Sequence, residues 1–179
     1  MSLIEDVEES GWVLGKDTID SIYACMQCGK CTGSCPSGRI TGYRTRVLMN
    51  KLQSGDKSIL EDPDIWLCTT CYTCYERCPR EVKTTDVIRA LRNVAAKEGY
   101  MSKAHRATAM YVIKTGHAVP INDATKKLRK KLGLSEIPPT THKYPEALKA
   151  IQAISKKMKF DKLVGFDWNT MNLEEREEK

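Results

Sequence analysis

The residues most able to do chemistry in this chain are eight cysteines, which fall into two runs of four. Each run has the spacing C-x2-C-x2-C-x3-C-P, and every cysteine of the second run lies 43 positions after its counterpart in the first. The runs are Cys25, Cys28, Cys31 and Cys35, and then Cys68, Cys71, Cys74 and Cys78. In bacterial-type iron–sulfur proteins with this spacing, three cysteines of a run bind one cubane cluster and the fourth ligates the other cluster. The sequence therefore predicts two [4Fe-4S] clusters.

The predicted ligand sets are crossed, because each combines three cysteines of one run with the last cysteine of the other. The first cluster takes Cys25, Cys28, Cys31 and Cys78, and the second takes Cys68, Cys71, Cys74 and Cys35. A proline follows the last cysteine of each run, and proline disfavours helix at the residue before it. We therefore expect the chain to turn away from its own cluster at Cys35 and at Cys78.

Other uses of cysteine fit this pattern less well. Paired C-x2-C units form structural zinc sites, but a zinc ion takes only four ligands, and three cysteines in each tight run suit tetrahedral zinc poorly. Disulfides are typical of secreted proteins, and nothing marks this chain as secreted. A catalytic C-x-x-C pair is expected once, on a strand-to-helix turn. Zinc stays an alternative that a colourless protein would support.

The residues between the cysteines offer hydrogen bonds and charge, which together with solvent exposure set the potential of a cluster. The expected backbone N–H donors to sulfur are Gly29, Lys30, Thr32, Gly33, Thr69, Thr70, Tyr72 and Thr73. Lys30 and Arg77 could also raise a potential through their charge, although solvated surface residues explain them equally well.

No catalytic arrangement accompanies the cysteines. His105, His117 and His142 are isolated in the sequence, and each is better explained as a core or surface residue than as a ligand. The chain has no Gly-rich phosphate loop and no nucleophile elbow. We therefore predict no catalytic residue and no substrate site in this chain, but a role in electron transfer.

The composition limits the other functions. The chain has 179 residues, 41% of them hydrophobic, and a formal charge of +6. Two oxidised cubanes with their thiolates would each contribute about −2 and reduce that charge to about +2. The modest core also predicts that metal binding is coupled to folding, with residues 20–80 largely disordered without iron. The basic segment 126–131 leaves an iron–sulfur nucleic-acid-binding protein as an alternative, but a solvated or partner-binding face explains it better, so we predict no nucleic-acid partner.

The sequence offers no targeting or membrane segment. The first nine residues are acidic and lack the apolar stretch of a signal peptide. No run approaches the roughly 18 apolar residues that a spanning helix requires. We therefore expect a cytoplasmic protein without direct membrane insertion.

The elements that must position the cysteines are expected to be helices, because apolar residues recur at helical spacing and no stretch alternates like a strand. The expected helices are 17–24, 41–54, 84–98, 102–115, 122–132 and 145–158, with short helical turns at 58–61 and 62–67. The prediction is an all-α fold in three parts. These are an N-terminal leader (1–16) that is irregular or a single strand, an α-helical ferredoxin domain with two clusters (17–134), and a C-terminal extension (135–179) with a proline-containing linker, a helix and a charged tail.

An all-helical scaffold with two C-x2-C-x2-C-x3-C-P runs resembles the α-helical ferredoxin domain. That domain also occurs in iron–sulfur subunits of succinate, fumarate and anaerobic glycerol-3-phosphate dehydrogenases, which usually add a further domain or differ in the ligands of one cluster. This chain stands alone, keeps all eight cysteines and has a lysine-rich helical end after Gly116. In this form it resembles the C-subunit family of the soluble heterodisulfide reductases of methanogenic archaea, over roughly residues 15–135.

The resemblance implies partners and a role. In that family, a flavin-containing subunit bifurcates electrons from a hydrogenase or a formate dehydrogenase. A disulfide-reducing subunit reduces the mixed disulfide of coenzyme M and coenzyme B. The resemblance implies that this chain relays electrons between those two subunits through its two [4Fe-4S] clusters. The same motif leaves an iron–sulfur subunit of a succinate/fumarate or glycerol-3-phosphate type of complex as the alternative.

Overall fold

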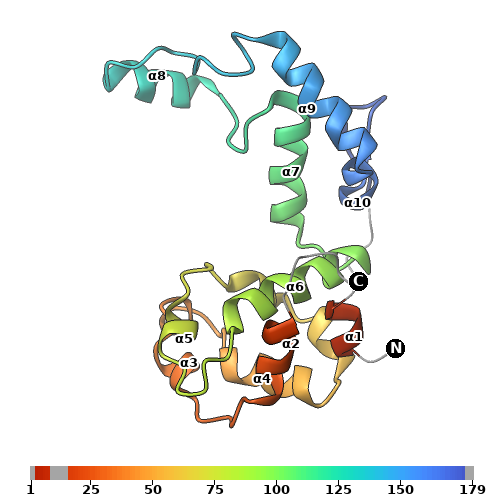
Figure 1. The fold of residues 1–179 in the computed structure, drawn as a ribbon. Coiled ribbons are helices and arrows are strands. Elements are labelled where there is room, and N and C mark those ends of the chain that lie inside the picture. Colours follow the sequence, from red (N-terminus) through yellow and green to blue (C-terminus); the bar gives the residue numbers. More distant parts are fainter. Residues whose placement is uncertain (1–2, 9–15, 176–179) are drawn as a thin grey trace. The chain divides into compact units, whose positions relative to one another are not determined.

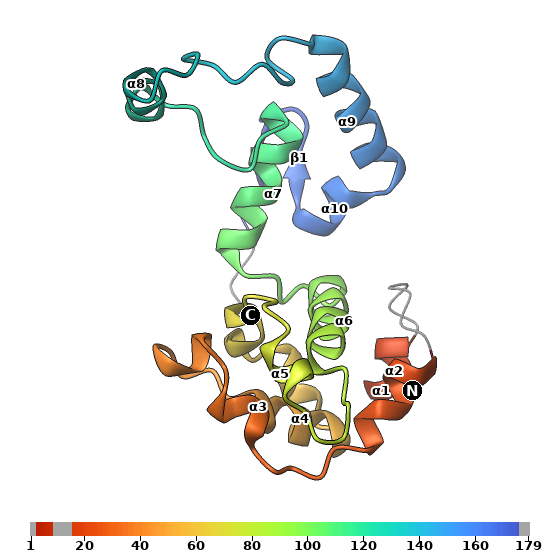
Figure 2. The same cartoon turned by 60° about the vertical axis from the view of Figure 1, so that its left-hand side comes forward.

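The computed structural model describes residues 3–8 and 16–175 of the chain, and nearly all of its regular structure is helical (Figures 1 and 2). The predicted all-α fold is confirmed. Within the described residues, the extended pairing consists of β1 (Phe166–Asp167) and β2 (Asn172–Leu173), which are antiparallel with Phe166 opposite Leu173. The chain separates into two compact units, one ending at Tyr100 and the other beginning at Met101.

The N-terminal unit consists of short helices and 3-10 turns joined by the cysteine runs. Its helices are α1 (Leu3–Glu8), α2 (Lys16–Tyr23), α3 (Lys30–Gly33), α4 (Thr45–Gln53), α5 (Thr73–Glu76) and α6 (Thr84–Lys97), and its 3-10 turns are η1 (Ser37–Arg39), η2 (Lys57–Leu60) and η3 (Pro63–Leu67). Side-chain caps start the last two turns, since Asp56 accepts from the Ser58 N–H and Asp62 from the Asp64 N–H, each at 3.0 Å. Pro63 occupies the first position of η3, where its missing N–H costs nothing.

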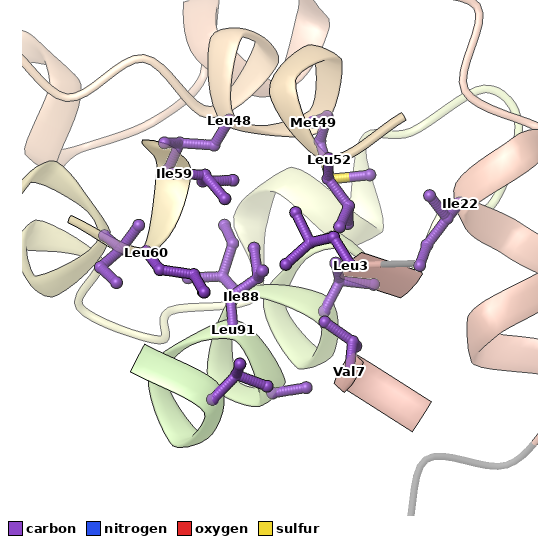
Figure 3. Packing of buried hydrophobic residues seen from close by; sticks show 14 of the residues in the cluster. Leu3, Val7, Ile22, Leu48, Met49, Leu52, Ile59, Leu60, Ile88 and Leu91 are labelled. Atoms are coloured by element: carbon purple, nitrogen blue, oxygen red, sulfur yellow. The ribbon is translucent and has the colours of Figure 1, made fainter. Parts of the chain in front are cut away.

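Helix α6 forms the centre of the core of this unit. Its buried apolar face, with residues at helical spacing, consists of Val87, Ile88, Leu91, Val94 and Ala95. Helices α1 and α2 and the turns η2 and η3 all pack against α6. Figure 3 shows Ile88 and Leu91 of α6 among side chains that come from α1, α2, α4 and η2. These helices form the scaffold that carries the cysteine loops.

The leader and the second expected helix differ from expectation. Residues 3–8 form α1, and its Leu3 and Val7 are fully buried, whereas the sequence predicts an irregular or extended leader. The rest of the leader, with its apolar patch at 12–14, lies outside the described residues. Helix α4 begins at Thr45 rather than 41. Its buried face therefore includes Met49, whereas Val47 is 41% exposed.

The C-terminal unit has a small core of its own. Its elements are α7 (Lys103–Thr115), α8 (Asp123–Lys131), α9 (Pro145–Lys157), α10 (Phe160–Val164), β1 and β2. Ile113, Val164 and Phe166 form the buried cluster. Buried Arg106 of α7 donates to the carbonyl oxygens of Val164 and Glu174, both at 2.9 Å. The structure thus groups α7 with α9, α10 and the hairpin, whereas the sequence assigns residues 101–134 to the cluster domain and expects a charged tail from residue 173.

One carboxylate of this unit gives a pH-dependent prediction. Buried Asp161 accepts a hydrogen bond from Trp168 Nε1 at 2.6 Å. That bond, with the Lys162 N–H, holds the pKa of Asp161 below its ordinary value. A carboxyl whose pKa is lowered on folding stabilises the fold above its unfolded pKa of about 4, and the gain disappears as the pH falls through the folded pKa.

We therefore expect Trp168→Phe to reduce hydrogen-exchange protection of α10 about tenfold at pH 7, the effect of losing one charge-assisted hydrogen bond. As the pH falls through the lowered pKa of Asp161, the difference from the wild type should become smaller, because protonation removes the charge from this hydrogen bond. Hydrogen-exchange mass spectrometry of the iron-free protein, whose C-terminal unit has its own buried core, measures the protection of α10 from pH 7 downward. A loss of protection that stays the same over the whole pH range would contradict this account.

Candidate iron-sulfur site

The four cysteines of each predicted ligand set line one hollow of the N-terminal unit. The first hollow is lined by Cys25, Cys28, Cys31 and Cys78, and the second by Cys35, Cys68, Cys71 and Cys74. Their volumes, open mouths included, are about 370 and 260 Å³. Each run thus places three cysteines at one hollow and its last cysteine at the other. This is the grouping of the crossed sets, while ligation of iron by these residues stays a prediction.

Left-handed backbone turns curl the first run around its hollow. Gln27 and Gly29 have φ of 58° and 80°, a conformation that is costly for glutamine. Side chains support this turn, since Gln27 Nε2 donates to Gln53 Oε1 at 2.8 Å and lies 3.5 Å from Cys25 Sγ. Gln53 Nε2 in turn donates to the carbonyl oxygens of Ile22 and Cys25 at 3.0 and 3.1 Å. Helix α4 therefore holds the start of the first run in place, a contact that sequence reasoning missed.

The last cysteine of each run receives a backbone hydrogen bond from the turn that follows it. The Gly38 N–H donates to Cys35 Sγ at 3.4 Å, and the Val82 N–H donates to Cys78 Sγ at 3.3 Å. Sequence reasoning placed the donors inside the runs instead. One of these, the Gly33 N–H, donates to the carbonyl oxygen of Gly29 at 3.0 Å. The Cys-Pro ending of each run could have predicted these donors, because the chain turns there and the N–H groups of the turn point back to the sulfur.

The walls of the two hollows differ in polarity. Exposed Lys30, Arg46 and Arg80 line the first hollow, and Arg77, the other cation proposed from the sequence, is not part of its lining. Because these cations are exposed, solvent and salt screen their charge.

Hydroxyl groups line the second hollow in place of cations. The lining includes Tyr43, Thr45, Thr69, Tyr72 and Thr85. Thr85 Oγ1 lies 3.2 Å from Cys74 Sγ.

The cysteine thiols of the site differ in pKa and in exposure. Burial raises the pKa of Cys31 and that of Cys74, whereas a hydrogen bond with Thr73 lowers the pKa of Cys71. A thiol binds metal as thiolate, so metal binding at the buried thiols must displace a firmly held proton. In each set one cysteine is exposed, Cys28 in the first and Cys71 in the second. A cofactor held there would approach the surface near these two residues.

Arg92 of α6 fixes the start of the second run. Its Nε donates to the carbonyl oxygen of Ile65 at 2.7 Å and its Nη2 to that of Cys68 at 2.5 Å. The guanidinium also lies over the ring of Trp66, 5.7 Å from its centroid. Trp66 itself packs against the core. Burial lowers the pKa of Arg92, but a guanidinium stays charged in proteins.

The residues present fit iron–sulfur chemistry. Each hollow gathers four cysteine sulfurs, and backbone N–H groups donate to sulfur at both. Among the described residues, no three His, Cys, Asp or Glu side chains lie close enough to share a single metal ion. The four cysteines of each set line a hollow, and a cubane cluster needs such a space.

The histidines lie in the C-terminal unit, and none lines either hollow. His117 and His142, expected to be isolated, stack with ring centroids 5.1 Å apart and planes inclined by 12°. His105 Nδ1 lies 2.7 Å from the hydroxyl of Ser102, which caps α7. These two histidines are therefore not isolated. They meet because residues 135–144 fold back onto the end of α7, where the Thr141 hydroxyl donates to the carbonyl oxygen of Thr115 at 2.8 Å.

Comparison with known proteins agrees with this chemistry. Residues 16–82, which contain all eight cysteines, match the family model of a 4Fe-4S dicluster domain. The chain is 58% identical over 172 residues to the iron-sulfur C subunit of the CoB–CoM heterodisulfide reductase of Methanopyrus kandleri, covering 96% of this chain and 86% of the relative. The chain belongs to the C-subunit family of heterodisulfide reductases. The resemblance seen in the cysteine runs is therefore confirmed.

Other members of the C-subunit family carry names with different electron donors. One is the C2 subunit of the H2/formate:CoB–CoM heterodisulfide, ferredoxin reductase of Methanococcus maripaludis, 50% identical over 173 residues, with 96% of this chain and 94% of the relative covered. Another is the C subunit of the ferredoxin:CoB–CoM heterodisulfide reductase of Methanosarcina mazei, 49% identical over 142 residues, with 79% and 88% covered. Membership in the C-subunit family thus does not fix the donor.

Gly38 offers a local test of the second hollow. A Cβ at this position would lie 2.7 Å from the Tyr43 carbonyl oxygen and 3.5 Å from Cys35 Cβ. Movement is restricted, because the Gly38 N–H donates to Cys35 Sγ and its carbonyl oxygen accepts from Arg44 Nη1 at 3.0 Å. We expect Gly38→Ala to displace Cys35, to cost about 1–3 kcal/mol of stability and to reduce iron content toward half.

Gly33→Ala is the matched control for this substitution. Gly33 lies five residues earlier, within the first cysteine run, and a Cβ there would meet nothing within 4 Å. Iron analysis and thermal unfolding of both variants under anaerobic conditions provide the comparison. Equal iron content and equal melting temperature for the two variants would show that the clash at Gly38 is relieved without moving Cys35.

Proposed function

We propose that this chain is the electron-relay subunit of a CoB–CoM heterodisulfide reductase. In this proposal two [4Fe-4S] clusters are held by the crossed sets, Cys25, Cys28, Cys31 and Cys78 for the first and Cys68, Cys71, Cys74 and Cys35 for the second. The observation that carries the proposal is the pair of four-cysteine hollows in a member of the C-subunit family. Bound clusters would supply one-electron redox chemistry.

The residues of the chain perform the remaining tasks of a relay. The cysteines hold the cofactors, and the Gly38 and Val82 N–H groups stabilise negative charge on sulfur. The core around α6 keeps one side of the site dry and the cysteine loops in register. Exposed Cys28 and Cys71 mark where electrons would enter and leave. We assign no catalytic residue to this chain, because reduction of the disulfide belongs to a different protein of the complex.

The proposed partners are a flavin-containing subunit, which bifurcates electrons, and a disulfide-reducing subunit, which acts on the heterodisulfide, with an associated hydrogenase or formate dehydrogenase. The names of the relatives support such an assembly, since they mention hydrogen, formate, ferredoxin and the CoB–CoM heterodisulfide. A cytoplasmic location without nucleic acid is part of the same proposal. Across residues 3–8 and 16–175, no helix is both long and apolar enough to cross a membrane.

Anaerobic purification of the native complex through a tag on this chain tests the proposal. We expect a flavoprotein and a second cysteine-rich protein to copurify, and the complex to reduce the heterodisulfide. The isolated chain should be brown and inactive with that substrate. Undiminished heterodisulfide reduction by a complex assembled without this chain, or salt-dependent binding of the chain to DNA in place of protein partners, would overturn it.

A further inference from the structure

Two buried hydroxyl groups at the second hollow have no hydrogen-bond partner among the described residues. Tyr43 is 1% exposed and Thr45 is 0% exposed, and both line this hollow beside Cys68 and Cys74. The hydroxyl oxygens of both residues lack a partner within the part of the chain that the structure describes. A buried polar group left unpaired is strongly unfavourable, so each such group in a native structure requires an explanation.

Packing alone does not explain a tyrosine at position 43. A phenylalanine would fill the same volume without burying a hydroxyl. A tyrosine hydroxyl with its ordinary pKa of about 10 is protonated at neutral pH, so Tyr43 offers the hollow an O–H donor.

Two other hydroxyls described on this wall are already engaged. Tyr72 OH lies 2.9 Å from Asp86 Oδ1 and 2.9 Å from Arg89 Nη1. Thr85 Oγ1 lies 3.2 Å from Cys74 Sγ. The lining of the first hollow contains no tyrosine and carries exposed cations instead. An unsatisfied hydroxyl pair thus distinguishes the second hollow from the first.

We infer that the Tyr43 hydroxyl donates a hydrogen bond to a sulfur atom of the second cluster, with Thr45 as a second donor beside it, and that this raises the reduction potential of that cluster. The inference rests on the proposed ligation by Cys68, Cys71, Cys74 and Cys35. Reduction adds negative charge to the cluster, and a hydrogen bond to a more negative sulfur is stronger. The donor therefore favours the reduced state, and the two clusters of the relay are tuned by different means.

Potentiometric titration of the iron-loaded chain, followed by electron paramagnetic resonance, tests the inference. We expect Tyr43→Phe to lower the reduced-to-oxidised ratio of one cluster about fivefold at a fixed ambient potential, the effect of one ordinary hydrogen bond. The other cluster should titrate as in the wild type, and iron content should not change. Thr45→Val should shift the same cluster in the same direction. A Cys25→Ala, Cys78→Ala background, in which only the second ligand set is intact, identifies the shifted cluster.

Tyr72→Phe is the matched control, because it removes a hydroxyl from the same wall that Asp86 and Arg89 already engage. Unchanged potentials in Tyr43→Phe, or an equal shift in Tyr72→Phe, would overturn the inference. If Tyr43→Phe fails to bind iron, Thr45→Val decides, and an unchanged potential there overturns it. A wild-type chain that binds no clusters at these cysteines would instead refute the proposed ligation, so the two failures are distinguishable.

Discussion

A chain with both Cys25→Ala and Cys78→Ala should still bind about four irons, whereas one with both Cys68→Ala and Cys78→Ala should bind almost none. In the crossed arrangement the first pair belongs to a single ligand set, so the other cluster keeps all four of its cysteines. The second pair removes one ligand from each set. Both double variants lose two cysteines, and they differ only in how the losses are distributed between the clusters.

The mirror-image pair of variants provides the control. Cys35→Ala with Cys68→Ala should retain about four irons, and Cys35→Ala with Cys25→Ala should retain almost none. Iron and acid-labile sulfide are counted after anaerobic reconstitution, together with the visible absorption of the clusters. The opposite pattern in the four variants would mean that each run encloses its own cluster. Each hollow contains the last cysteine of the opposite run, which leads us to expect the crossed outcome.

Iron removal should abolish protection from hydrogen exchange over residues 20–83 while leaving α7 and α9 unchanged. The cysteine loops surround the two hollows, and without clusters these become voids with thiols on opposing walls. Metal binding then acts as folding free energy for this segment. The C-terminal unit has its own buried cluster of Ile113, Val164 and Phe166 and serves as the internal reference.

Hydrogen-exchange mass spectrometry of the loaded protein and of chelated, reduced protein measures this effect. The structure also refines the sequence-based expectation for iron-free protein. Helix α6 packs against α1, which lies outside 20–83 (Figure 3), so residual protection should persist in α6 after 20–83 has opened. Equal protection of 20–83 in the two forms would show that the scaffold folds without metal.

Local patterns in the sequence were enough to predict the type of cofactor and the positions of most helices. The C-x2-C-x2-C-x3-C-P spacing places three thiols within one loop, so the type of cofactor follows from covalent geometry. The apolar period of 84–98 predicts α6, and the helix expected at 102–115 agrees with α7, which Ser102 and Gly116 cap. Apolar residues at helical spacing also occur in α1, at Leu3 and Val7, but this helix is too short for the spacing to be recognised in the sequence.

What the tertiary structure decided involves residues far apart in the sequence. Arg92 reaches the Cys68 carbonyl oxygen from α6, and Gln53 of α4 holds the Cys25 carbonyl oxygen. Tyr43 falls within the helix expected at 41–54, yet it lies before α4 and lines the second hollow. Periodicity and spacing describe neighbours along the chain. Which hydroxyl, amide or guanidinium meets a given sulfur loop depends on how the helices pack, and only the folded chain fixes that.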